Sequence, residues 1–190
     1  MPAGARAGHP VPVSDDGGGA TTGRRHGVAE PGHRADEAGA LLGFLQRQRD
    51  LVAWKVGGAD DAALRAVATP TGLTAHGVVR HLENVERDWV RRVFAGEQGL
   101  AFDWTDEDPD GELHVPVGVP MAALLAAYAE ESRRCDAVVA AASLDDVSST
   151  GGFRLRWILL HLVEETARHL GHLDLLRELA DGAVGEEPSA

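Results

Sequence analysis

Apolar residues recur at steps of three and four along most of the chain after residue 35, as they do in helices that bury one side. No stretch shows the alternation of apolar and polar residues that is typical of a half-buried strand. The pattern predicts four helices, over about residues 36–56, 71–95, 120–139 and 153–179. The sequence therefore predicts an all-α protein, a four-helix bundle.

The first part of the chain, residues 1–35, has no apolar period and is rich in Gly, Pro, Ser and Thr. Such a segment cannot bury enough apolar surface to offset the entropy lost on ordering, so it is predicted to be a disordered N-terminal arm. The folded domain is expected over residues 36–185, followed by a short tail, 186–190. Three histidines lie in the arm and are predicted to be inert: His9, His26 and His33.

The amino-acid composition argues against two classes of binding partner. The formal net charge is −12, with 30 acidic against 18 basic residues, and no Lys/Arg-rich run is present, which argues against nucleic acid and anionic membranes. The single cysteine, Cys135, cannot form an internal disulfide, and no segment has the apolar length of a secretory signal or a membrane span. A cytoplasmic protein is expected, and its oligomeric state is left open.

A long irregular stretch separates the second and third predicted helices. Residues 97–118 hold Trp104, two prolines and a cluster of acidic residues from Asp103 to Asp110. Loops of this length in compact domains are often functional or mobile. The stretch is predicted to be a lid that contributes to substrate specificity.

The candidate chemistry lies on the last predicted helix. His161, Glu165, His169 and His172 follow one another at intervals of four, four and three residues, so they lie within about 80° of arc on one face. Apolar residues flank this stripe, so part of it should point inward, where a histidine or carboxylate needs a partner to offset desolvation. A bound metal ion would supply that partner.

Glu165 and His169 are one helical turn apart, which lets both side chains reach the same ion. A third ligand must come from another helix, and His81, on the apolar side of the second one, is the best candidate. Two histidines and one carboxylate would leave coordination positions open, as catalytic zinc requires. Iron(II) or nickel would also suit this donor set. The simpler alternatives are a histidine at the edge of the core and a surface pair between Glu165 and Arg168.

Two segments resemble the DinB/YfiT-like metalloprotein superfamily, in particular its actinobacterial mini-circle-type branch. Residues 71–89, TGLTAHGVVRHLENVERDW, are similar to the second helix of that branch, which carries the first metal ligand. Residues 155–185, LRWILLHLVEETARHLGHLDLLRELADGAVG, are similar to its fourth helix and tail. The resemblance extends over about residues 37–185. Members usually have a second histidine where this chain has Glu165, although the related mycothiol-dependent maleylpyruvate isomerase also combines His and Glu ligands.

The resemblance implies a bundle with the metal at one end of its core, held by His81, Glu165 and His169. It also implies a low-molecular-weight thiol as cosubstrate, which is mycothiol in actinobacteria, and an electrophilic second substrate. A thiol bound at such a zinc ion loses its proton at neutral pH and can then attack an electrophile or assist an isomerisation. His161 and His172 are predicted to line this pocket as catalytic proton acceptors or as hydrogen-bond partners of the ligands.

Two further hypotheses remain at this stage. The first is a different metalloenzyme on the same scaffold, a hydrolase or lyase of a specialised biosynthetic pathway, in which the ion activates water or polarises a carbonyl. The second is a stress-induced helical module without catalytic activity, whose metal only stabilises the fold. A closed coordination shell would favour the second hypothesis.

Overall fold

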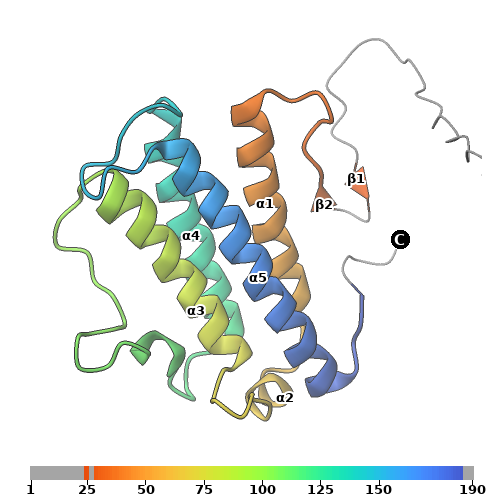
Figure 1. Cartoon of the computed structure of the whole chain (residues 1–190). Helices are drawn as coiled ribbons and strands as arrows, with labels where there is room; N and C mark the ends of the chain where they lie inside the picture. Colours follow the sequence, from red (N-terminus) through yellow and green to blue (C-terminus); the bar gives the residue numbers. More distant parts are fainter. Residues whose placement is uncertain (1–23, 26–27, 186–190) are drawn as a thin grey trace, which may run out of the picture.

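A computed structural model describes residues 24–25 and 28–185, and it shows four long helices lying side by side (Figure 1). The predicted all-α bundle is confirmed. Residues 1–23 and 26–27 of the predicted arm, with His9 and His26, and the tail 186–190 lie outside the described residues. The long helices are α1 (Glu37–Val56), α3 (Ala75–Glu86), which continues as the π-helix η1 (Arg87–Phe94), α4 (Met121–Ala140) and α5 (Leu155–Asp181).

Four short elements were not predicted from the sequence. Two are the helix α2 (Asp61–Arg65) and the single 3-10 turn η2 (Gly111–Leu113), which lies inside the long loop. The other two are the strands β1 (Arg24–Arg25) and β2 (Val28–Ala29), which pair antiparallel within the segment predicted as an arm. None of the four is long enough to produce a periodic apolar pattern.

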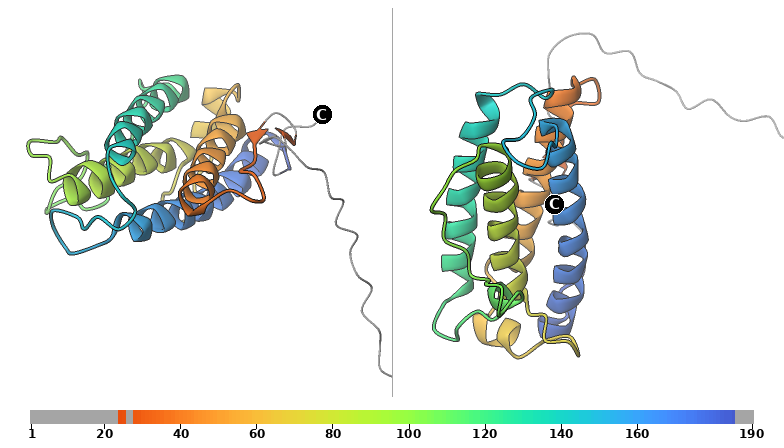
Figure 2. Two further views of the ribbon diagram at one scale, coloured as in Figure 1. Left: turned by 90° about the horizontal axis from the view of Figure 1, so that it is seen from above. Right: turned by 60° about the vertical axis from the view of Figure 1, so that its left-hand side comes forward.

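The chain does not simply run up and down. The helices α3 and α4 point in the same direction, and the loop between them returns along the length of the bundle, as Figure 1 and the right-hand view of Figure 2 show. The helix α5 packs against both α1 and α3, while α3 also packs against α4. None of the helices in the described part of the chain has the length and apolarity needed to cross a bilayer.

A buried ion pair lies between two apolar clusters of the core. Arg49 of α1 donates two hydrogen bonds to Glu86 of α3, at 2.8 and 2.6 Å, and a third at 2.9 Å to Asp136 of α4. The Glu86 side chain is 1% exposed. The cluster at one end includes Val52, Val78, Leu124 and Leu173. The cluster at the other end includes Leu45, Val90, Cys135 and Ile158.

The π-helix begins directly after this ion pair. The thiol of Cys135 donates to the carbonyl of Glu86, with 3.4 Å between sulfur and oxygen. A π-helix bonds each residue to the fifth one before it, so each residue advances by a smaller rotation than in an α-helix. The smaller rotation keeps Trp89 on the side of η1 that faces α5, where it contacts Trp157 and His161.

The carboxylate of Asp61 joins three elements at the other end of the bundle. It accepts hydrogen bonds from the backbone N–H of Met121 at 2.7 Å, from His76 Nε2 at 2.9 Å and from Arg65 Nε at 3.0 Å. The Met121 N–H is one of the donors left without a partner at the start of α4. This bond, followed by the one from His76, lowers the pKa of Asp61 to about 2.

Replacing Asp61 with alanine should lower the free energy of unfolding by about 1 kcal/mol near neutral pH, the usual cost of losing a helix cap. Because the folded-state pKa is depressed, the contribution of Asp61 is complete above the unfolded pKa of 3.8 and is lost as the pH falls through about 2. The gap between the urea unfolding curves of the two proteins should therefore narrow steadily as the pH falls from 5 to 2.5. The exposed loop variant Asp106→Ala is the control, and a gap independent of pH would contradict this role.

Candidate metal centre

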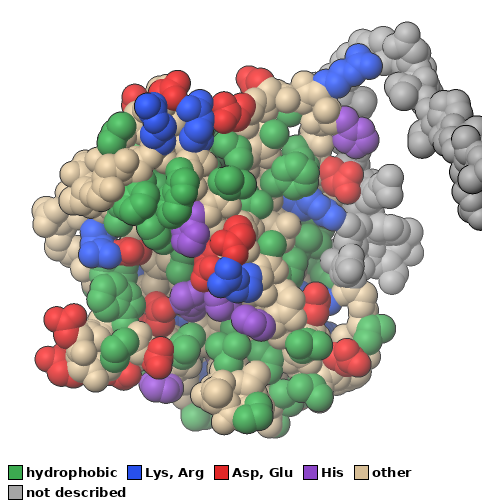
Figure 3. Space-filling model, viewed as in Figure 1, with side chains coloured by type: hydrophobic (Ala, Val, Ile, Leu, Met, Phe, Trp, Pro, Cys, Tyr) green, Lys and Arg blue, Asp and Glu red, His purple; other side chains and the backbone are tan. Residues whose placement is uncertain are grey.

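The structure brings together the three side chains predicted as metal ligands. His81 comes from α3, and Glu165 and His169 come from α5. Glu165 Oε1 lies 3.2 Å from His81 Nε2 and 3.1 Å from His169 Nε2, and the two imidazole rings lie 4.5 Å apart. The side chains are 14–20% exposed. Solvent therefore reaches the cluster, and Figure 3 shows histidine side chains gathered near the middle of the face in view.

The donor set fits a divalent metal ion. One suitable atom from each of the three residues lies within 4.8 Å of the other two. Ligand atoms about 2.0–2.1 Å from a tetrahedral zinc ion are about 3.3 Å from one another, close to the two distances that join the imidazoles to the carboxylate. Two imidazoles and one carboxylate are also ligands that zinc accepts.

Neighbouring charges and burial shift the pKa values of all three candidate ligands. Burial by itself would lower the pKa of His81, but the hydrogen bonds and negative charges of Glu112 and Glu165 outweigh it and raise that pKa. Burial opposes the charge of Glu165, yet the hydrogen bond from His81 and the two histidine charges lower its pKa overall. Burial, and then the charge of His81, lowers the pKa of His169 to about 4, so this imidazole is neutral at pH 7.

Glu112 is a residue of the site that sequence reasoning missed. Its Oε1 lies 2.5 Å from His81 Nδ1, and its Oε2 accepts a hydrogen bond from Asn84 at 2.9 Å. Asn84 also donates to Asp103 of the same loop, at 3.3 Å. A carboxylate on the far nitrogen of a ligating histidine fixes the tautomer that leaves the other nitrogen free for the metal. The predicted lid, residues 97–118, thus supplies the partner of His81.

Gly77 lets this loop approach α3. A Cβ atom at position 77 would lie 2.6 Å from the carbonyl oxygen of Leu113, closer than packed atoms allow. Only glycine therefore permits η2 to pack against α3 one turn before His81. The sequence showed Gly77 within the segment that resembles the family's second helix, but it did not predict that the loop packs against this glycine.

The two predicted catalytic histidines lie on opposite sides of the ligand pair on α5. His172 Nδ1 is 3.3 Å from His169 Nδ1, so one of these nitrogens donates to the other. If His169 donates, its Nε2 is left as a lone pair facing Glu165 and His81. His161 instead packs against the rings of Trp89 and Trp157, with ring centres 4.8 and 5.4 Å away.

The other histidines of the described residues and the cysteine lie away from the candidate metal ligands. His76 is 1% exposed and bonds to Asp61, away from the metal ligands. His114 is exposed and lies near Asp108, and His33, from the predicted arm, is also exposed. Cys135 is fully buried, and burial raises the pKa of its thiol, which makes it a poor nucleophile.

Comparison with known proteins identifies the family. A family model described as mycothiol-S-transferase matches residues 40–182, which is most of the domain and includes all three candidate ligands. The match confirms the resemblance to the DinB/YfiT-like superfamily drawn from two of the helices. A search of curated proteins gives no match.

The first prediction for this site concerns the ligands. Protein purified without an affinity tag should contain stoichiometric divalent metal by elemental analysis, and His81→Ala and His169→Ala should each lose most of it, because two donors hold an ion far more weakly than three. His114→Ala removes an exposed histidine and is the control. Unchanged metal content in both ligand variants would exclude the site.

The second prediction concerns the partners of those ligands. Glu112→Gln and His172→Ala should each weaken metal affinity by about 10- to 100-fold, as is usual when the hydrogen bond that orients a ligating histidine is lost. Affinity is measured by competition with a chromogenic chelator. Glu107→Gln, an exposed residue of the same loop, should leave affinity unchanged. Equal affinities for all four proteins would show that neither residue orients a ligand.

Proposed function

Because the chain belongs to the mycothiol-S-transferase family, we propose that it transfers mycothiol to an electrophile with the help of a divalent metal ion, for which zinc is the best candidate. The observation that carries this proposal is the convergence of His81, Glu165 and His169 from two helices. When bound there, the ion would lower the pKa of a coordinated thiol and so supply thiolate at neutral pH.

The protein's own residues would hold and orient these donors. Glu112 would keep a proton on His81 Nδ1, so that the unprotonated Nε2 would be the atom that binds the metal. With His169 as the donor of the bond between the two Nδ1 atoms, His172 would accept that proton in the same way. This arrangement would make His172 a positioning residue, because its Nδ1 lone pair would be engaged and its Nε2 would carry the proton.

The reaction forms one bond and breaks two. The thiol loses its S–H proton to solvent, which reaches the site because the ligand side chains are 14–20% exposed. The sulfur attacks an electrophilic carbon, a C–S bond forms, and the leaving group departs with the bonding electrons of the bond that breaks. Three protein donors leave room beside the ion for the thiol, as open catalytic zinc sites do.

The test is a conjugation assay. Metal-loaded protein, mycothiol and an activated aryl halide should give a thioether of the summed mass minus the hydrogen halide, detected by mass spectrometry. The rate should fall at least 100-fold after metal is removed or in Glu165→Ala, and return in the first case when metal is added back. Glutathione in place of mycothiol tests the choice of thiol.

Two outcomes would overturn the proposal. Turnover of a substrate without any thiol would favour the metal-dependent hydrolase or lyase. Metal that raises the thermal midpoint of unfolding while no tested electrophile is conjugated would favour the non-catalytic module, in which the ion only stabilises the fold.

A further inference from the structure

Aromatic side chains continue the line of the candidate ligands along α5. His161, Trp157 and Phe153 follow Glu165 at successive four-residue steps toward the start of the helix. The rings of His161 and Trp157 are stacked, 5.4 Å apart and tilted by 17°, and those of Trp157 and Phe153 are 4.8 Å apart and tilted by 28°. Trp89 of η1 contacts all three, with ring centres 4.8–5.4 Å away. We call these four residues the aromatic wall.

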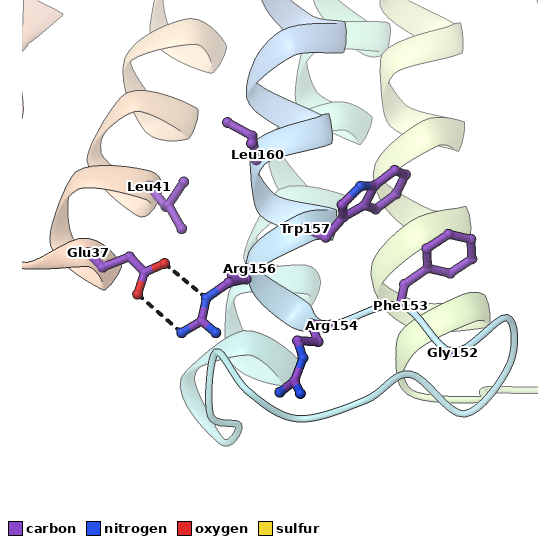
Figure 4. Close-up of a pocket in the computed structure, with 8 residues that line it drawn as sticks. All are labelled: Glu37, Leu41, Gly152, Phe153, Arg154, Arg156, Trp157 and Leu160. Carbon is purple, nitrogen blue, oxygen red and sulfur yellow. Dashed lines mark hydrogen bonds and ion pairs between the residues drawn. The ribbon is translucent and has the colours of Figure 1, made fainter.

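Part of this wall is open to solvent. Trp157 is 45% exposed although it contacts three other rings, and the neighbouring Leu160 is 58% exposed. Both border a cavity of about 430 Å³ between α5 and the start of α1, which is within the size range of small-molecule sites. Figure 4 shows Leu41 and Leu160 between the two helices and the rings of Trp157 and Phe153 on the other side of α5. Trp157 thus belongs to both the cavity and the wall.

The charges around the cavity are neutralised. Arg156 donates to Glu37 at 2.9 Å (Figure 4). It also pairs with Asp145. Arg154 pairs with Asp145 as well, at 3.1 Å. Among the residues described, the cavity therefore offers an apolar surface without an uncompensated charge. An uncharged ligand loses less hydration there than an anion or a cation would.

We propose that the aromatic wall and this cavity bind the electrophile, and that the preferred electrophiles are uncharged, extended and planar aromatic compounds. This inference rests on the proposed function. At a rise of about 1.5 Å per residue, His161 lies about 6 Å and Trp157 about 12 Å along the helix from Glu165. A molecule of two or three fused rings reaches from beside the thiol past His161 toward Trp157, so that its reactive carbon meets the thiol while its flat part lies against the wall.

The thiol is the other molecule that could occupy the wall. The body of mycothiol is rich in hydroxyl groups, and such groups need hydrogen-bond partners when they leave water. The ion pairs described above already occupy the side-chain polar groups of Arg154, Arg156 and Glu37 beside the cavity. The electrophile is therefore the occupant that these surroundings favour.

The first experiment measures binding without chemistry. Naphthalene carboxamide, which is planar, uncharged and unreactive, is titrated by calorimetry into metal-free protein without thiol. Trp157→Ala and Leu160→Ser should each weaken its binding at least 10-fold, while Trp54→Ala, which removes a tryptophan of α1 outside the cavity, should not. The carboxylate analogue should bind more weakly than the amide. Equal binding to wild type and both cavity variants would overturn the proposal.

The second experiment separates the two substrates. In the conjugation assay, Trp157→Ala should raise the KM for a naphthyl electrophile at least 10-fold and leave the KM for mycothiol and for a short aliphatic electrophile unchanged. A raised KM for mycothiol alone would assign the wall to the thiol and overturn the proposal. If the carboxamide binds as expected but no thiol is ever transferred, the aromatic site stands and the proposed function fails.

Discussion

The buried pair of Arg49 and Glu86 is the interaction on which the rest of the structure depends. Removing both charges from water is costly, and the bidentate geometry and the further bonds from Arg49 to Asp136 and Gln46 offset that cost. These bonds are satisfied in one arrangement of α1, α3 and α4. The same residue of α3 is followed at once by the π-helix, so the pair holds α3 against α1 and α4 between the helical turn that carries His81 and the one that carries Trp89.

The sequence predicted the long helices because each buries one side, and a buried side leaves a period of three to four residues. The π-helix was not foreseen, since apolar positions such as Val90 and Phe94 fit either kind of helix over so short a stretch. The helix α2, the turn η2 and the paired strands depend on contacts with distant residues. The bond from Met121 to Asp61 is one such contact, and it crosses 60 positions of sequence.

The candidate site was predictable to the extent that it is local. Glu165 and His169 are one turn apart on a single helix, so their proximity follows from the helix itself. His81 lies 84 positions away from Glu165, so helix geometry does not bring the two together; its place on the apolar side of its own helix made it a candidate, and the resemblance to a known family then implied it as a ligand. Glu112 gave no signal, because its place against His81 depends on how a loop without periodicity passes over Gly77.

Because α3 and α4 run parallel, the loop between them must return along the length of α3, and it contains more residues than that distance requires. The segment Ala75–Phe94 is about 30 Å long at the usual rise of a helix, and about nine extended residues would cover that distance. The connection from Ala95 to Pro120 is more than twice as long. The surplus is the part that folds back over α3, so related chains could gain or lose residues there without changing the bundle, while changing what surrounds the candidate metal site.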